Sequence, residues 1–255
     1  RRHTRLRTVT GVQTCVFRSG IPALATQAAR VTPRGVLASF DAQTLRFLEE
    51  QDFIGPSGLP RERQAQLQRE FRQVQGWAGG GYPYRLLLRD GKPGGEAGVG
   101  SNAFALPNGT IVMTDQLVAL ARSDRELLGV LAHETGHVTR RHGLATVYQG
   151  LGLGLVTTLL TGDLVSASTF AAAVPAAILR GGYSRAAEAE PDRVSADFMR
   201  GRYGTTKPLQ DILTRLEAGA RGPDARDSEP TWLDIFRSHP VTADRVAALK
   251  ALDAR

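Results

Sequence analysis

The chain has 255 residues, of which 42% are hydrophobic, enough for one sizeable core or for a core with a small extension. Its net charge of +7 is uneven, because residues 1–19 carry five arginines and no acid, and the remaining 27 basic and 25 acidic residues nearly cancel. A chain balanced in this way lacks the excess of basic residues that nucleic-acid binding favours. We therefore expect no nucleic-acid partner.

Residues 1–19 read poorly as protein. The runs "RRHTR" and "VTGVQTC" resemble the translation of a sequencing-library adapter. We interpret this segment as non-native and exclude it from the fold; a basic, disordered tail is the alternative. Cys15, the single cysteine, lies within it, so cysteine content says nothing about the redox compartment. The native N-terminus is then expected to be missing, which leaves membrane attachment through it open.

Residues 20–80 predict a helical N-terminal extension ahead of a main domain over residues 81–255. The runs "DAQTLRFLEEQ" and "PRERQAQLQREFRQVQGW" place apolar residues at helical spacing, and the breaker run "GPSGLP" separates them.

The first part of the main domain contains the predicted strands. "YRLLLRD" (84–90) predicts a strand, and "SNAFALPNGTIVMTD" (101–115) predicts a hairpin around Pro107-Asn108-Gly109. The glycine-rich loop between them has no phosphate-loop spacing. Strands and helices do not alternate as a parallel α/β sheet requires. We expect an α+β fold that is mostly helical, with a small antiparallel β-sheet or hairpin.

The next helix has a clear start and stop. Ser123 and Glu126 match a capping box, which predicts that the helix begins at Asp124, and Gly143 is a natural stop. The run "VLAHETGHVTRRH" (130–142) therefore lies on this helix.

Residues 151–179 form the most apolar stretch. A membrane span needs about 20 consecutive apolar residues, and Gly162-Asp163 interrupts this run. We expect two buried or surface-lying helices here, with membrane contact as the less favoured alternative. From residue 183 onward the pattern is helical, apart from a polar loop at 220–230.

His133 and His137 lie four residues apart on the predicted helix, so both imidazoles leave the same face. Two imidazoles so placed can bind one Zn²⁺ at about 2.0–2.1 Å. The adjacent Glu134 can reach a water on the metal and take its proton, as in the H-E-x-x-H arrangement of zinc proteases. Two histidines in ordinary surface or core contacts are the alternative.

A third ligand has to come from another element, and the best acidic cluster is "YSRAAEAEPDR" (183–193). Glu188 and Asp192 lie four residues apart, so a helix would place both on one face. One of them could bind the metal while the other orients a ligand histidine through a hydrogen bond. Without the upstream motif, a solvated acidic face would be the default interpretation.

Four runs, in this order, resemble the zinc metallopeptidases related to the CAAX prenyl protease and to bacterial periplasmic proteases of outer-membrane quality control. They are "NAFALPNGTIVMTD", "LGVLAHETGHVTRRH", "YSRAAEAEPDR" and "SHPVTADR", and the resemblance covers residues 32–254. It implies that residues 81–255 form a zinc metallopeptidase domain. It also implies that Glu188 is the third zinc ligand, that Asp192 supports the site, and that Glu134 is the catalytic base.

Pro191 stands where this family usually has alanine. A proline inside a helix costs about 3 kcal/mol or more. The helix is therefore expected to kink at Pro191 or to begin just before it. Either change would alter the direction in which the Glu188 side chain points.

The resemblance also points to a strand that binds substrate. "SNAFALP" resembles the family's edge strand, which borders the active site and could hold an extended peptide by strand addition. The alternative is an ordinary hairpin strand. The residues concerned are Asn102, Ala103, Phe104 and Ala105.

Three further residues have weaker assignments. His239, in "SHP", resembles a histidine near the family's site; it could fill an open zinc position or stabilise an oxyanion, and an ordinary loop histidine is the alternative. Arg245 is a candidate for binding a carbonyl or the substrate. His142 lies five residues after His137 and is expected to face away from it in a structural role.

These residues predict a metalloendopeptidase that binds one Zn²⁺ per chain and cuts unfolded or extended polypeptides. The alternative is a zinc-stabilised chaperone or assembly factor that binds chains without cutting them. The resemblance implies a bacterial cell-envelope location, periplasmic or membrane-associated, and a role in protein quality control. Membrane association through the missing N-terminus or residues 151–179 stays open.

Overall fold

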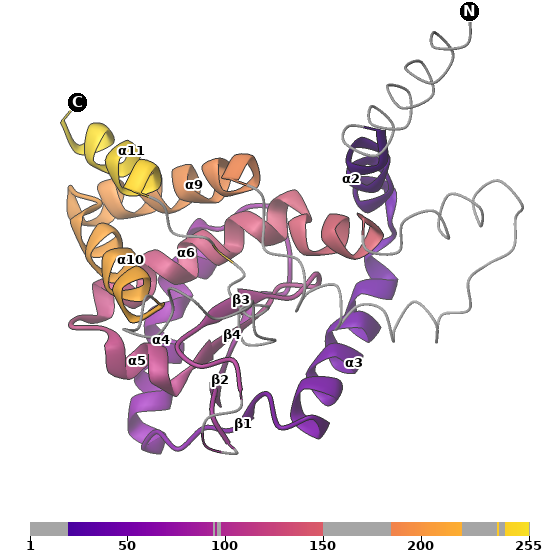
Figure 1. Ribbon diagram of the computed structural model, residues 1–255, viewed down its shortest axis with the longest axis horizontal. Coiled ribbons are helices and arrows are strands. Elements are labelled where there is room, and N and C mark those ends of the chain that lie inside the picture. The colour runs from indigo at the N-terminus through magenta and orange to yellow at the C-terminus, as the bar shows by residue number, and fades with distance from the viewer. Residues whose placement is uncertain are drawn as a thin grey trace, which may run out of the picture.

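The computed structural model describes residues 20–93, 95, 98–149, 185–220, 239 and 243–254. Its helices are α2 (Ile21–Val31), α3 (Leu37–Glu50), α4 (Arg61–Trp77), α5 (Asp115–Leu120), α6 (Asp124–Arg140), α9 (Arg185–Tyr203), α10 (Lys207–Ala220) and α11 (Ala243–Asp253), with a 3-10 turn, η2, at Arg34–Val36. The strands are β1 (Gly55–Pro56), β2 (Arg85–Asp90), β3 (Ala103–Ala105) and β4 (Thr110–Thr114). The expected α+β class, mostly helical, is confirmed (Figure 1).

Some expectations fall outside the described residues. They concern residues 1–19, the two helices expected within 151–179, and most of the polar loop at 220–230.

The four strands form one sheet in the order β1-β2-β4-β3. β3 and β4 form the expected antiparallel hairpin, but the sheet is mixed rather than antiparallel, because β4 runs parallel to β2. After β2 the chain first forms β3 at the edge of the sheet. The hairpin turn then brings β4 back between β3 and β2. β1 was not expected, because it is only two residues long and lies in the predicted breaker run.

The two faces of the sheet pack against different layers. Ala103 and Ala105 of β3 belong to the main core, which includes residues of α4, α6, α9, α10 and α11. Phe104, between them, belongs to a second cluster with Leu45 and Leu48 of α3. The edge strand therefore turns its small side chains toward α6 and its large one toward α3.

The expected extension over residues 20–80 packs closely against the rest of the protein. α4 contributes Leu67, Phe71 and Val74 to the main core. The domain boundary at residue 80 stays a prediction.

α6 begins at Asp124, as expected. The capping differs from the predicted box, because the Ser123 side chain makes no cap hydrogen bond. Instead, the Glu126 carboxylate accepts the backbone N–H of Arg122 at 2.8 Å. A charged acceptor close to the first turn satisfies a donor and complements the helix dipole.

The end of α6 differs from the prediction at Gly143. The helix stops at Arg140, because Arg141 adopts a left-handed conformation with φ 57°. The Arg141 guanidinium donates to the carbonyl oxygens of Ala29 and Thr32, at 2.7 and 2.6 Å, where α2 ends. These contacts with α2 hold the break in place. A second helical segment follows over residues 142–149.

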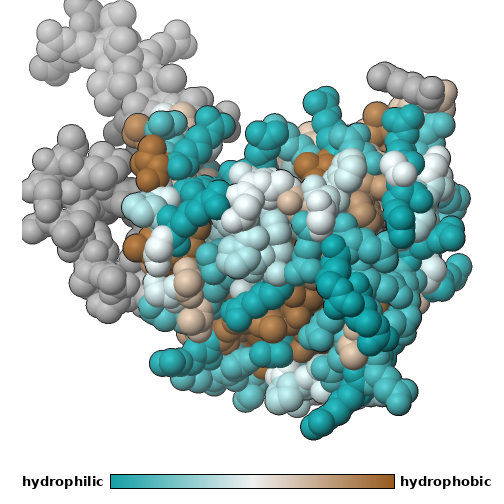
Figure 2. All heavy atoms as spheres, turned by 180° about the vertical axis from the view of Figure 1, so that it is seen from behind, coloured by the Kyte–Doolittle hydropathy of each residue, from teal (hydrophilic) through white to brown (hydrophobic). Residues whose placement is uncertain are grey.

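The surface of the described residues is mostly hydrophilic on the face behind that of Figure 1, with apolar side chains in a shallow hollow (Figure 2). The exposed large apolar side chains among the described residues are Leu24, Val31, Val36 and Trp77. Within the described part of the chain, no helix is long and apolar enough to span a bilayer.

The hairpin turn between β3 and β4 is held by α3. Gly109 has φ 99°, a conformation that suits glycine and agrees with the turn predicted at this position. The buried carboxylate of Asp41 accepts the backbone N–H groups of Asn108 and Thr110 at 2.9 and 3.4 Å. Burial raises the pKa of Asp41 to about 6, although these N–H donors oppose the shift. A titratable group thus anchors the edge strand.

We expect Asp41→Asn to change how the free energy of unfolding depends on pH, because the variant lacks the titrating carboxylate. The folded pKa is about 6, whereas an aspartate in the unfolded chain has a pKa of about 3.9. The folded state therefore favours the protonated form, so this contribution to stability is complete below about pH 4 and is lost as the pH rises through about 6. Relative to the variant, the wild type should lose on the order of 2–3 kcal/mol of unfolding free energy over this range. Urea unfolding of both metal-free proteins measures it, and a difference that does not change with pH would contradict it.

Candidate metal centre

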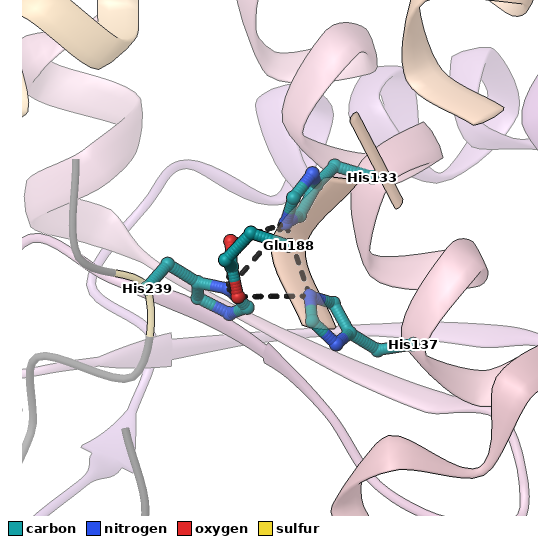
Figure 3. Close-up of side chains that lie close together, drawn as sticks. All are labelled: His133, His137, Glu188 and His239. Atoms are coloured by element: carbon teal, nitrogen blue, oxygen red, sulfur yellow. Dashed lines mark hydrogen bonds and ion pairs between the residues drawn. The ribbon is translucent and has the colours of Figure 1, made fainter. Parts of the chain in front are cut away.

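His133 and His137 lie on one face of α6, and their Nε2 atoms are 3.0 Å apart (Figure 3). Two nitrogens bound to one tetrahedral zinc ion at about 2.0–2.1 Å would be about 3.3 Å apart. Both side chains are buried, with 4% and 1% of their residue surface exposed. The pair therefore fits a single shared ion, at a site that excludes most water.

Glu188 comes from α9 and points at the two imidazoles (Figure 3). Its carboxylate oxygens lie 3.3 Å from Nε2 of His133 and 3.6 Å from Nε2 of His137. α9 begins at Arg185 and continues through Pro191, so Glu188 lies in its first turn. Pro191 does not turn the carboxylate away from the histidines.

Pro191 lies against α6 at Gly136. A Cβ atom on Gly136 would come within 2.7 Å of the Cα atom of Pro191. The two helices therefore cross at backbone contact, which a larger residue on α6 would prevent. Because Gly136 directly precedes His137, this crossing sets the distance from which Glu188 reaches the imidazoles.

His239 approaches the same point from a segment that follows His133 by 106 residues in the sequence. Its Nδ1 lies 3.1 Å from Oε1 of Glu188 and 3.4 Å from Nε2 of His133. One ligand atom from each of four residues lies within 4.8 Å of all the others. These residues are His133, His137, Glu188 and His239.

The donors of this cluster fit zinc. Three imidazoles and one carboxylate are nitrogen and oxygen ligands of the kind that Zn²⁺ takes in four-coordinate sites. Oε2 of Glu134 is buried beside them and finds no hydrogen-bond partner among the described residues. A buried carboxylate oxygen without a partner is costly, so a cation and its water would stabilise this arrangement.

Glu134 is buried next to the cluster, with its Oε1 3.2 Å from Nε2 of His239. Burial raises the pKa of Glu134 to about 7; the His239 charge opposes this shift and the Glu188 charge adds to it. The backbone of Ala105, on β3, also donates to this carboxylate and lowers its pKa. The edge strand therefore borders the carboxylate directly.

Two further pKa shifts favour metal binding, whereas that of His133 opposes it: burial lowers the pKa of His133, but its hydrogen bonds to Asp192 and Glu188 raise it above the usual value. Burial alone would raise the pKa of Glu188, but hydrogen bonds from His133 and His239 hold it well below its usual range. Burial, together with the charges of His239 and His133, holds the pKa of His137 well below its usual value. An ionised carboxylate and a neutral imidazole are the forms that bind a metal ion.

Asp192 contacts the far side of His133, with Oδ1 3.0 Å from Nδ1. This is the nitrogen that a hydrogen-bonded carboxylate would contact in order to orient a ligand imidazole. Arg245, from α11, donates to both oxygens of Asp192 at 2.8 and 2.7 Å and lies 2.9 Å from Glu188. Its buried guanidinium thus contacts two carboxylates, and its expected role at a carbonyl or the substrate stays a prediction.

The structure separates the four candidate residues of the edge strand. Ala103 and Ala105 face the α6 side, and Phe104 packs toward α3. The backbone carbonyl of Asn102 accepts the N–H of Thr114 at 3.0 Å. Within this set, Ala105 is shown to contact the site, through its backbone hydrogen bond to Glu134.

The expectation that His142 faces away from His137 is wrong. Their Nδ1 atoms are 3.1 Å apart, and the two rings meet edge to face with centroids 5.1 Å apart. On a regular helix, residues five apart point in different directions. The left-handed Arg141 interrupts the helix between them and turns His142 back.

The part of the chain that contains these residues matches known proteins. The profile described as peptidase family M48 matches residues 62–253. A protein named Protease HtpX homolog, from Methylibium petroleiphilum, is 29% identical over 185 residues, which cover 59% of this chain and 64% of that protein.

Two proteins from Escherichia coli have a similar sequence identity to this chain. Metalloprotease YcaL is 30% identical over 161 residues, which cover 58% of this chain and 57% of its own length. Metalloprotease LoiP is 27% identical over 157 residues, with the same two coverages, 58% and 57%. The chain thus spans less than two thirds of the length of these relatives.

Gly136→Ala should disturb the centre through the helix crossing. The added Cβ would meet the Pro191 backbone at 2.7 Å, so α9 must shift and carry Glu188 away from the imidazoles. We expect a loss of about 1–3 kcal/mol in unfolding free energy and weaker zinc binding. Gly201→Ala on α9 is the matched control. A Cβ atom at Gly201 meets nothing within 4 Å, so this change should be neutral or stabilising. Equal behaviour of the two variants in urea unfolding and zinc titration would refute the crossing argument.

Arg245→Met should destabilise the metal-free protein. It leaves Glu188 and Asp192 buried without their guanidinium partner, and breaking a buried ion pair costs about 3–5 kcal/mol. Saturating zinc should recover part of the loss, because it replaces positive charge at Glu188. Arg63→Met, which removes a half-exposed partner of Asp124, should cost no more than about 1 kcal/mol. Urea unfolding with and without zinc measures both; an unchanged stability for Arg245→Met would show that the guanidinium is dispensable.

Proposed function

Because the chain belongs to peptidase family M48, we propose that it is a zinc-dependent endopeptidase that hydrolyses extended or misfolded proteins. One zinc ion per chain would be held by His133, His137 and Glu188. The observation that carries the proposal is the convergence of these three side chains with His239, within 4.8 Å, beside the buried Glu134. The names of the metalloprotease relatives support it.

Glu134 would carry the proton in this reaction. Zinc bound at the centre supplies Lewis acidity, which lowers the pKa of water toward about 7 and polarises a carbonyl. The Glu134 carboxylate accepts the proton of the attacking water as the water oxygen bonds to the carbonyl carbon. It then delivers that proton to the amine nitrogen as the C–N bond breaks. A pKa of about 7 in the metal-free protein suits a group that both accepts and releases a proton.

The backbone of β3 supports binding of an extended substrate. Asn102 accepts a hydrogen bond from β4, and Leu106 donates one to β4. In an antiparallel ladder the paired residues alternate, so the backbone groups of Ala103 and Ala105 are directed away from β4. The Ala105 N–H acts on Glu134. A peptide that adds to this edge as a further strand would therefore run past the catalytic carboxylate.

His239 has two roles that its position supports. As a fourth zinc ligand it would close the centre and keep the enzyme latent until it moves away. Displaced from zinc by the substrate, it could stabilise the oxyanion. Its Nδ1, 3.1 Å from Glu188, favours the ligand role in the conformation described.

The family resemblance also bears on where in the cell the protein acts. Its resemblance to bacterial periplasmic proteases favours the cell envelope and a role in protein quality control. Membrane association through residues 151–179 stays a prediction.

Glu134→Gln tests the catalytic role. The change removes the proton acceptor but keeps the shape, so casein cleavage should fall about 10²–10⁴-fold while zinc stays bound at one per chain. Glu190→Gln is the matched control: Glu190 is an exposed glutamate on α9, paired with Arg140, and its loss should leave cleavage unchanged. Chelation should abolish the wild-type cleavage, and added zinc should restore it. If the wild type binds casein with stoichiometric zinc but never cuts it, the chaperone alternative replaces the peptidase.

A further inference from the structure

The two ligand histidines of α6 both have a partner on the nitrogen that faces away from the cluster. Asp192 lies 3.0 Å from Nδ1 of His133. His142 lies on the corresponding side of His137, with 3.1 Å between the two Nδ1 atoms. The other nitrogen of His137, Nε2, is the one that faces Glu188, at 3.6 Å.

The chemistry of imidazole fixes the direction of the hydrogen bond between His137 and His142. A neutral imidazole carries one N–H, and the nitrogen that binds a metal must offer its lone pair. With Nε2 of His137 directed at the metal ligands, its proton belongs on Nδ1. Nδ1 of His142 must then be the acceptor, which leaves the proton of His142 on its own Nε2.

We propose that His142 is a positioning residue of the metal centre: it accepts a hydrogen bond from His137 and thereby holds that imidazole in the tautomer and orientation that bind zinc. The inference rests on the proposed zinc site. It adds to the site a residue outside the H-E-x-x-H motif and outside the donor cluster.

A neutral acceptor suits this position better than a carboxylate would. Three carboxylates, Glu134, Glu188 and Asp192, already lie buried at the centre, and Arg245 contacts two of them. A further buried negative charge would have to be balanced as well. An imidazole nitrogen accepts the hydrogen bond from His137 without adding charge.

A matched pair of variants separates the hydrogen bond from the packing. Oδ1 of an asparagine is attached to the same carbon as Nδ1 of a histidine, so His142→Asn keeps an acceptor near the original position. His142→Leu has nearly the shape of asparagine and no acceptor. We expect His142→Leu to weaken zinc binding by about 10–100-fold, and His142→Asn to stay within about threefold of the wild type.

The measurement is zinc affinity, by competition with a chromophoric chelator at a single pH. Two further measurements accompany it. The visible spectrum of the Co²⁺-substituted proteins reports on the metal coordination, and the melting temperature of the metal-free proteins reports on packing. The Co²⁺ spectrum of His142→Leu should depart from the wild-type spectrum, whereas that of His142→Asn should match it. The two metal-free variants should melt within a few degrees of each other.

Each other outcome overturns the inference. Equal zinc affinities for His142→Leu and His142→Asn, whether both normal or both weak, would mean that the acceptor is irrelevant. A parallel loss of melting temperature and affinity in His142→Leu alone would assign the residue to packing. If the wild type binds no zinc, the proposed function itself fails, which is a result distinct from either of these.

Discussion

The backbone contact between α6 and α9 is the constraint on which the centre depends. Gly136 lets the Pro191 backbone approach, and this brings the carboxylate of Glu188 within 3.3 Å of an imidazole on the other helix. A wider spacing of the two helices would move this carboxylate away from the imidazoles. The same crossing carries Asp192 to the far side of His133. The close approach at this one glycine thus affects the placement of both Glu188 and Asp192 beside the imidazoles.

Several charged side chains are buried around this helix crossing. Glu134, Glu188 and Asp192 are all buried, and Arg245 lies against two of them. Burying three carboxylates is costly unless cations lie close by. The Arg245 guanidinium supplies positive charge at Glu188 and Asp192, and a divalent cation between the imidazoles and Glu188 would add more. Stability and metal binding therefore draw on the same charges.

Local sequence patterns predicted the elements that depend on local rules. The shared face of His133 and His137 follows from helix geometry, and the hairpin follows from its turn residues. The start of α6 at Asp124 was predicted correctly, although the Ser123 cap on which that prediction rested does not form. The convergence of Glu188 was inferred from a family resemblance, because no local rule relates residues fifty positions apart. The roles of these residues remain predictions until they are tested.

The features that were missed depend on tertiary contacts. The early end of α6 at Arg141 is held by carbonyl groups of α2, more than a hundred residues earlier in the chain. His142 was assigned the wrong direction for that reason, since regular helix geometry was carried across the break. The parallel pairing of β2 with β4 depends on the side of β4 on which β3 forms, which the alternation pattern of the strands does not indicate.

The separation of His133 from His239, 106 residues along the chain, has a consequence for biosynthesis. A ribosome completes the helix with the H-E-x-x-H motif long before it adds the segment with His239 and the helix with Arg245. Until those late residues emerge, the early histidines lack both a fourth donor and the guanidinium that balances Glu188 and Asp192. The complete cluster of buried charges can therefore form only after the segment with His239 and the helix with Arg245 have been synthesised.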